Sequence, residues 1–216
     1  DLGGDKNPHK SLTGYQEANP FMGFRGIRFC LEHTDVFKNQ LRAILRASHF
    51  GTIKILYPMI CSLAELKRSN VILEEAKQEL RDKNIPFDEH ILKGAMIEVP
   101  SAAAITDLMA DHCDFFSIGT NDLMQYLLAV DRINDRIAYL YEANQPAVIR
   151  TLNFIFQQGK SKNVPVSVCG ELAGDPLYAP LLIGLGATDL SVSMGSLAQI
   201  KYLIRRIRLH DAKHLA

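Results

Sequence analysis

The side chains best suited to chemistry lie just past a short apolar stretch. That stretch covers residues 115–118 and ends in Gly119, and Thr-Asn-Asp follows, which supplies Asn121 and Asp122. This pattern predicts a buried strand that delivers an amide and a carboxylate to its C-terminal end, where a helix begins. The first N–H groups of such a helix also offer donors to an anion.

Two further predicted strands end in residues that are useful in catalysis. One covers residues 95–98 and ends in Glu98, and the other covers residues 165–169 and ends in Cys169. Because Mg²⁺ binds through one or two carboxylates together with substrate oxygens, Glu98 and Asp122 predict a magnesium site. Cys169 adds a thiol that exchanges a proton if local charge tunes its pKa. Together these residues predict an active site.

The residues alone leave structural alternatives open. Glu98 and Asp122 also fit a strand-end acid and an acid that the helix dipole favours. Asn121 also fits a helix N-cap, and Cys169 a small buried apolar side chain. Arg132 follows Asp122 by ten residues, and its forked guanidinium suits a phosphate or carboxylate. A lone arginine, however, is usually a solvated surface residue.

Composition excludes several classes of protein. The 216 residues are 47% hydrophobic and 22% charged, as in an ordinary soluble globular domain. Lys and Arg together number 24, as do Asp and Glu, so no net charge favours nucleic acid or an anionic membrane. No apolar run approaches the roughly 20 residues that span a bilayer. The 4 cysteines form no C-x-x-C pair, which predicts reduced thiols in a cytoplasmic protein rather than a zinc site or disulfides.

Predicted strands and helices alternate along the chain. The strands cover residues 53–57, 95–98, 114–118, 165–169 and 189–193. The helices cover residues 34–48, 62–82, 101–111, 122–130, 145–160, 176–185 and 197–207. Thr34 or Asp35 is the expected cap of the first helix. Such alternation predicts parallel βαβ units.

The strand ends favour a (β/α)8 TIM-type barrel. Polar residues follow at least three different strands, which is where barrel enzymes carry their catalytic groups. No G-x-G-x-x-G follows the first strand, which argues against a dinucleotide-binding fold. A full barrel has about eight strands in about 250 residues, more than the strands predicted above. We therefore expect one partial barrel domain over residues 1–216, with at least one strand missing before Asp1.

Five segments resemble enzyme I, the phosphoenolpyruvate–protein phosphotransferase family of the bacterial sugar phosphotransferase system. They are residues 1–6, 19–28, 119–126, 129–132 and 169–175. The resemblance is colinear over nearly the whole chain and corresponds to the C-terminal, phosphoenolpyruvate-binding barrel of the family. Pyruvate phosphate dikinase and phosphoenolpyruvate synthase share this domain, but the Ala-Val-Asp-Arg run is more similar to enzyme I.

The resemblance implies roles for individual residues. It assigns Mg²⁺ to Glu98 and Asp122, and it makes Cys169 the candidate acid and base at C3 of the enolate. It assigns phosphoenolpyruvate binding to Arg25, Asn121, Asp122 and Arg132. Lys6 is a further candidate for the phosphate or for a rim salt bridge. Arg28 is a candidate for pairing with a structural acid, and Glu171 for orienting Cys169 or a water.

The chain departs from the family pattern at two positions that supply no ligand. Phe24 stands where a tryptophan is common, and Met124 where a threonine is common. The family also places two further substrate-binding arginines on strands that would precede Asp1. None of the 7 histidines lies in a phosphoacceptor setting.

The resemblance also implies partners. Phosphate would pass from phosphoenolpyruvate to a histidine on an N-terminal domain outside this sequence, and then to the carrier protein HPr. We expect a cytoplasmic homodimer that uses Mg²⁺, binds no nucleic acid and does not insert into a membrane. The alternatives are a synthase or dikinase domain, the nitrogen-regulatory branch of enzyme I, and a module that senses phosphoenolpyruvate or pyruvate without turnover.

Overall fold

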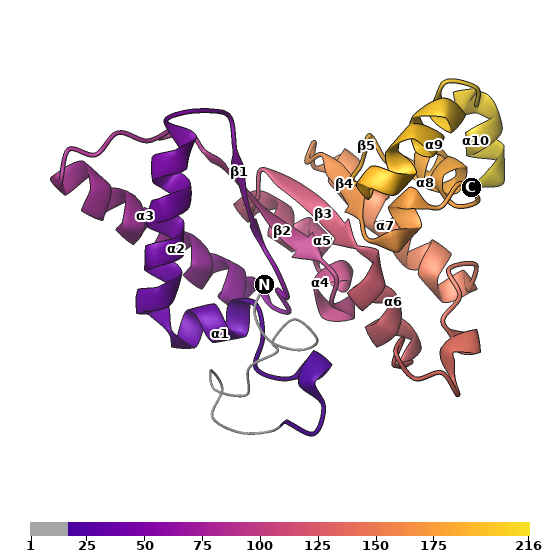
Figure 1. Ribbon diagram of the computed structural model, residues 1–216, viewed down its shortest axis with the longest axis horizontal. Helices are drawn as coiled ribbons and strands as arrows, with labels where there is room; N and C mark the ends of the chain where they lie inside the picture. Colours follow the sequence, from indigo (N-terminus) through magenta and orange to yellow (C-terminus); the bar gives the residue numbers. More distant parts are fainter. Residues whose placement is uncertain (1–16) are drawn as a thin grey trace. The chain divides into compact units, whose positions relative to one another are not determined.

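The computed structural model describes residues 17–216, which fall into two compact units. The first unit extends to Ala95, and the second runs from Met96 to Ala216. Figure 1 labels the helices and strands of both. The candidate Lys6 lies outside the described residues.

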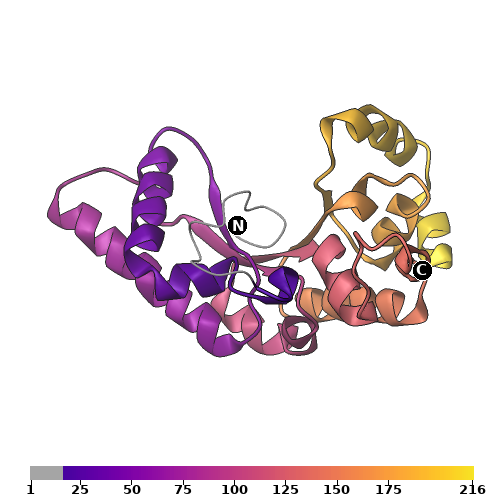
Figure 2. The same cartoon turned by 60° about the horizontal axis from the view of Figure 1, so that its bottom comes forward.

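The first unit combines helices with a pair of parallel strands. Its elements are η2 (Pro20–Met22), α1 (Ile27–Glu32), α2 (Thr34–Ser48), β1 (Lys54–Tyr57), α3 (Leu63–Asp82) and the first part of β2 (Leu92–Ile97). β1 and β2 pair in parallel from Lys54 opposite Leu92 to Tyr57 opposite Ala95. Helices α2 and α3 pack against each other, which Figure 2 also shows.

Local sequence sets the helix starts of the first unit. Ser62 and Glu65 form a capping box, in which each side chain accepts a hydrogen bond from the other residue's N–H, and α3 therefore begins at Leu63. The predicted cap of α2 is wrong, because His33 holds the N-cap position and makes no side-chain cap bond. Thr34 is already the first helical residue.

The second unit carries the polar strand ends. Its elements after the end of β2 are α4 (Pro100–Ala104), α5 (Thr106–Met109), η3 (Ala110–His112), β3 (Phe115–Gly119), α6 (Thr120–Leu128), η4 (Ala138–Leu140), α7 (Pro146–Ser161), β4 (Val166–Cys169), η5 (Glu171–Gly174), α8 (Ala179–Leu185), β5 (Asp189–Leu190), α9 (Met194–Ile204) and α10 (Leu209–Leu215). The strands follow one another in the order β2, β3, β4, β5. β3 pairs with β4 and β4 with β5, both in parallel.

The core of the second unit lies along these strands. Phe116, Ile118 and Val168 are fully buried. Phe116, Ser117, Ile118 and Gly119 of β3 are all buried, as expected for a strand inside a parallel sheet. Parallel strands that helices connect bring their carboxyl ends to one edge, so this unit gathers Ile97, Gly119 and Cys169 at the same end of the sheet.

Several predicted boundaries are wrong in this unit. The helix expected over residues 101–111 is broken at Ile105, where the Thr106 hydroxyl donates to the carbonyls of Ala102 and Ala103. The last strand is shorter than residues 189–193. The polar C-terminal tail forms a further helix, α10, which packs on α8. The close approach of Gly184 to the Ala212 carbonyl explains that packing.

Candidate active site

The junction of β3 and α6 places Asn121 and Asp122. β3 ends at Gly119, and α6 begins at Thr120, so both polar residues lie in the first helical turn. Gly119 is the N-cap residue, which means that Asn121 is not the helix cap. Asp122 is 6% exposed and lies where the helix dipole favours a negative charge.

Glu98 lies directly against this junction. It follows β2, and it is 4% exposed. A Cβ atom on Gly119 would lie 2.7 Å from Oε2 of Glu98 and 2.9 Å from its Cβ. Because the φ of Gly119 is −84°, its backbone does not require glycine. The glycine is needed for space, and that space holds the Glu98 carboxylate.

Cys169 reaches the same junction from the other neighbouring strand. It is the last residue of β4 and is paired in register with Gly119. Its Sγ accepts a hydrogen bond from the Ser117 hydroxyl at 3.5 Å and donates to the Ile118 carbonyl at 3.3 Å. The half-buried thiol therefore both accepts a hydrogen bond from β3 and donates one to it.

Gly170 allows β4 to be joined to the start of α6. Its φ of 92° favours glycine, and a Cβ there would meet the Thr120 hydroxyl at 2.4 Å. The Thr120 hydroxyl donates to the Cys169 carbonyl at 2.8 Å, and the Glu171 N–H donates to Asn121 Oδ1 at 3.0 Å. These two bonds keep Cys169 and Asn121 in one corner. Glu171 thus contacts Asn121 through its backbone N–H.

Arg132 turns back onto the helix that precedes it. Ala129 adopts a left-handed conformation, with φ 54°, and ends α6. Arg132 then donates from its backbone N to Gln125 Oε1 at 3.2 Å and from Nη1 to Asp122 Oδ1 at 3.1 Å. The side chains of Arg132 and Asp122 are 18% and 8% exposed, so this ion pair is largely withdrawn from water.

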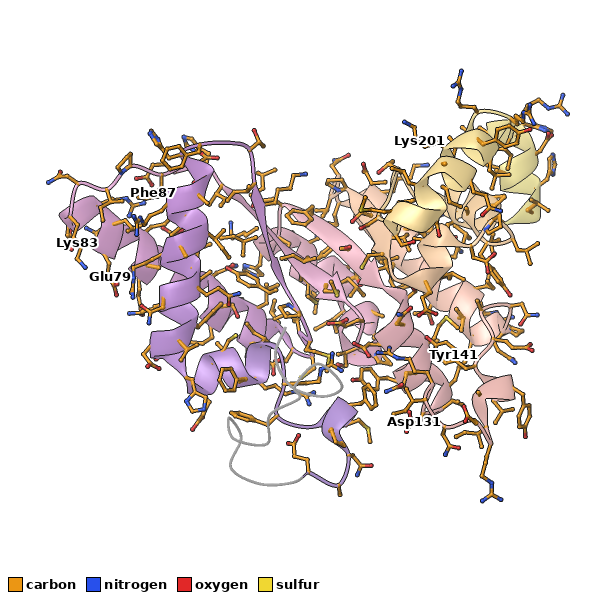
Figure 3. All side chains as sticks on the ribbon, viewed as in Figure 1. Glu79, Lys83, Phe87, Asp131, Tyr141 and Lys201 are labelled. Carbon is orange, nitrogen blue, oxygen red and sulfur yellow. The ribbon has the colours of Figure 1, made fainter. Side chains whose placement is uncertain are left out.

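Tyr141 also belongs to this corner, and no sequence signal pointed to it. Its hydroxyl donates to the Asn121 carbonyl at 2.8 Å. Burial raises the pKa of the Tyr141 phenol to about 12, the Arg132 guanidinium opposes that rise, and the charges of Glu171 and Asp122 add to it. Figure 3 labels Tyr141 in the segment that follows α6. Ser117 and Gln125 were missed as well, although a serine inside an apolar strand was a usable signal.

A pocket of ≈ 680 Å³ opens beside this corner in the second unit. Asn121, Glu171, Ser191, Ser193 and Ser196 are among its lining residues. A larger pocket of ≈ 870 Å³ is lined by Pro165 and Val166, at the opposite end of β4 from Cys169, and contains none of the predicted site residues. The smaller pocket is therefore the one that chemistry at the strand ends would use.

Arg25 belongs to the first unit. It is fully buried and its N–H donates to the Gly23 carbonyl at 3.1 Å. Arg28 donates from Nη1 to the carbonyls of Met22 and Gly23, at 2.7 and 3.0 Å. These bonds are to main-chain oxygens, where a structural acid was expected.

The other cysteines differ from Cys169 in their surroundings. Burial raises the pKa of the Cys30 thiol, and burial together with the Glu65 carboxylate raises that of Cys61. Cys113 is buried. Within residues 17–216 no group of three or more His, Cys, Asp or Glu side chains is arranged to hold a metal ion.

Comparison with known proteins decides the family. A family model described as PEP-utilising enzyme, PEP-binding domain, matches residues 1–209. The chain belongs to this family. The phosphoenolpyruvate-protein phosphotransferase of Priestia megaterium is 45% identical over 212 residues, which are 98% of this chain and 37% of that protein. The protein of the same name in Borreliella burgdorferi is 43% identical over 217 residues, covering 100% of this chain and 38% of that protein.

The chain therefore spans less than two-fifths of the length of those relatives. Among solved structures, a citrate lyase from Burkholderia xenovorans LB400 matches 80% of this chain and 55% of its own, with a TM-score of 0.60 and 17% identity. The likeness and the parallel strands confirm the predicted α/β fold of TIM-barrel type. Among the described residues no helix is both long and apolar enough to cross a membrane.

Proposed function

We propose that this chain is the phosphoenolpyruvate-binding part of a phosphoenolpyruvate–protein phosphotransferase. It binds phosphoenolpyruvate and supports transfer of the phosphoryl group to a histidine on a domain outside this sequence, and then to HPr. The names of the relatives support this proposal. We further propose that the protein works in the cytoplasm as a homodimer.

The observation that carries the proposal is the convergence on Gly119. Glu98 contacts Gly119 from the end of β2, Cys169 is in register with it on β4, and Asp122 follows it in α6. Three groups with acid–base or ligand chemistry thus surround one residue at the carboxyl ends of parallel strands. Barrel enzymes carry their catalytic groups at this end of the strands.

Glu98 and Asp122 fit a magnesium ion. Both carboxylates are buried, and carboxylate oxygens are the ligands that a hard divalent cation prefers. The buried Glu98 carboxylate occupies space that only a glycine at position 119 leaves open, which argues for a required rather than an incidental position. Bound there, Mg²⁺ would stabilise negative charge on the carboxylate and bridging oxygen of the substrate.

The anionic substrate meets donors from the start of α6 and from the segment after it. The first N–H groups of α6 favour an anion, and Asn121 and Asp122 lie in that turn. Arg132 supplies a guanidinium that binds phosphate or carboxylate through two parallel N–H bonds. Arg25, which is buried in a glycine-rich loop of the first unit, stays a predicted substrate-binding residue on the family resemblance alone.

Cys169 moves a proton at C3. Loss of the phosphoryl group leaves the enolate of pyruvate. The Cys169 S–H bond breaks, a C–H bond forms at C3, and pyruvate and a thiolate result. In the reverse direction the thiolate removes a proton from the methyl group of pyruvate. The Ser117 hydroxyl already donates to the sulfur, so it is placed to stabilise the thiolate.

Titration with oxalate, a mimic of the enolate, tests the proposed metal site. Wild-type protein should bind oxalate in the presence of Mg²⁺, and Glu98→Gln should weaken that binding at least about tenfold, because it removes one charged ligand. Glu142→Gln is the matched control, since Glu142 is an exposed acid of the same unit. Unchanged oxalate affinity in Glu98→Gln would show that the ligand assignment is wrong.

A further inference from the structure

The Tyr141 hydroxyl lies between two residues that the proposed function assigns to the substrate. Its O–H donates to the carbonyl of Asn121 at 2.8 Å, across 20 residues of sequence. A helix carbonyl that accepts the usual N–H four residues on has a second lone pair free for such a donor. The phenol therefore fixes the first turn of α6 without displacing its backbone bonds.

The Tyr141 phenol also interacts with the guanidinium of Arg132. A hydrogen bond and the positive charge of Arg132 both act on the phenol and lower its pKa, against the larger effect of burial. Since Arg132 has no acceptor, it must be the donor in this contact. Arg132 also donates to Asp122 Oδ1, so Tyr141 and Asp122 both hold its guanidinium.

Neighbouring residues show that this arrangement is specific to position 141. Tyr139 lies two residues earlier and is 71% exposed. Tyr141 is partly buried, and its hydroxyl is the group that reaches α6. A phenylalanine would fill the same space, so the hydroxyl is what distinguishes a positioning role from simple packing.

We propose that Tyr141 is a positioning residue for the substrate anion. Its hydroxyl sets the place of Arg132 relative to the first turn of α6, so that the guanidinium and the helix N–H groups meet one phosphate or carboxylate group together. This inference rests on the proposed function and deepens it, because it adds a residue that determines anion affinity. It assigns Tyr141 no proton transfer.

The test compares Tyr141→Phe with Tyr139→Phe. The first measurement is oxalate affinity with Mg²⁺; the second is deuterium exchange at C3 of pyruvate, resolved into KM and kcat. Tyr141→Phe should weaken oxalate binding and raise the KM for pyruvate by about fivefold to tenfold, the effect of one hydrogen bond to a charged group. Its kcat should stay within about twofold, since binding is what changes. Tyr139→Phe should match the wild type.

Two additional measurements separate positioning from structural damage. The thermal midpoint of Tyr141→Phe should stay close to that of Tyr139→Phe. In a protein that already carries Arg132→Lys, Tyr141→Phe should weaken oxalate binding by a smaller factor than it does in the wild type. The reason is that the two side chains act on the anion as a unit. The inference would be overturned if kcat fell by the same factor as KM rose. It would also be overturned if the losses of anion affinity in Tyr141→Phe and Arg132→Lys were fully additive.

Failure of the inference is distinct from failure of the proposed function. If wild-type protein binds neither oxalate nor pyruvate, the proposed function is wrong, and the role of Tyr141 falls with it. If the wild type binds both and Tyr141→Phe binds them equally well, the inference alone is overturned.

Discussion

Arg132 donates from Nη1 to Oδ1 of Asp122 at 3.1 Å, from the segment just after the helix that carries Asp122. The proposed substrate-binding cation and the proposed metal-binding acid therefore neutralise each other in this structure. If Asp122 binds a divalent cation as proposed, the charge of Arg132 would become available to an anion. The ion pair thus couples the proposed metal-binding residues to the proposed anion-binding residues.

Replacing Arg132 by methionine should destabilise the protein. The Asp122 side chain is 8% exposed and would lose its guanidinium partner. Breaking a buried ion pair by removing one member costs about 3 kcal/mol of unfolding free energy, and urea denaturation measures it. Arg136→Met, an exposed arginine of the same segment, is the control and should stay within about 0.5 kcal/mol of the wild type. Equal losses in both variants would contradict the structural role of the pair.

Replacing Gly119 by alanine should displace the Glu98 carboxylate. The added Cβ would lie 2.7 Å from Glu98 Oε2, closer than any stable contact. We expect weaker Mg²⁺-dependent oxalate binding, by at least about tenfold, and a lower thermal midpoint. Gly51→Ala is the control, because nothing lies within 4 Å of a Cβ at that position. Wild-type oxalate affinity in Gly119→Ala would remove the contact that supports the metal site.

The Tyr141 phenol should ionise at a higher pH than an ordinary tyrosine. Its pKa rises to about 12, chiefly through burial, with the Arg132 guanidinium acting in the opposite direction. The difference in phenolate absorbance between wild type and Tyr141→Phe should therefore develop near pH 12. A difference that is complete near pH 10, the ordinary tyrosine value, would contradict the burial of this group.

The raised pKa of Tyr141 also determines how the stability of the protein changes with pH. Folding raises the pKa of Tyr141, so the folded protein holds this proton more tightly than the unfolded chain does. The contribution of Tyr141 to stability is complete below about pH 10 and is lost as the pH rises toward 12. Urea midpoints of wild type and Tyr141→Phe should therefore agree below about pH 10. Above that pH they should separate, with the wild type becoming less stable than the variant, because only the wild type must ionise a buried phenol.

The elements that sequence predicts well have strong local signals. Helix α2 was predicted with its observed bounds from the spacing of its apolar residues, and α3 begins where its capping box places it. The junction at Gly119 was predicted from an apolar run that ends in a glycine and polar residues. The prediction of one continuous helix over residues 101–111 was wrong. The Thr106 hydroxyl competes for helix carbonyls near the break, and the spacing of apolar residues does not reveal this.

The contacts that complete the site depend on segments distant in sequence. Tyr141 reaches Asn121 because Ala129 takes a left-handed conformation, which a non-glycine residue adopts rarely. The bond from the Glu171 N–H to Asn121 Oδ1 joins residues 50 apart. Neither contact has a local pattern, so the sequence predicted which residues end the strands but not what holds them in place.

Deuterium exchange into C3 of pyruvate tests the central claim most directly. With Mg²⁺ in D₂O, wild-type protein should label the methyl group of pyruvate, because Cys169 exchanges its proton with that carbon. Cys169→Ala should exchange at least about 100-fold more slowly, the usual contribution of a positioned acid–base group, while Cys30→Ala should match the wild type. A wild-type protein that binds pyruvate without labelling it would favour a sensing module, and undiminished labelling by Cys169→Ala would contradict the proposed mechanism.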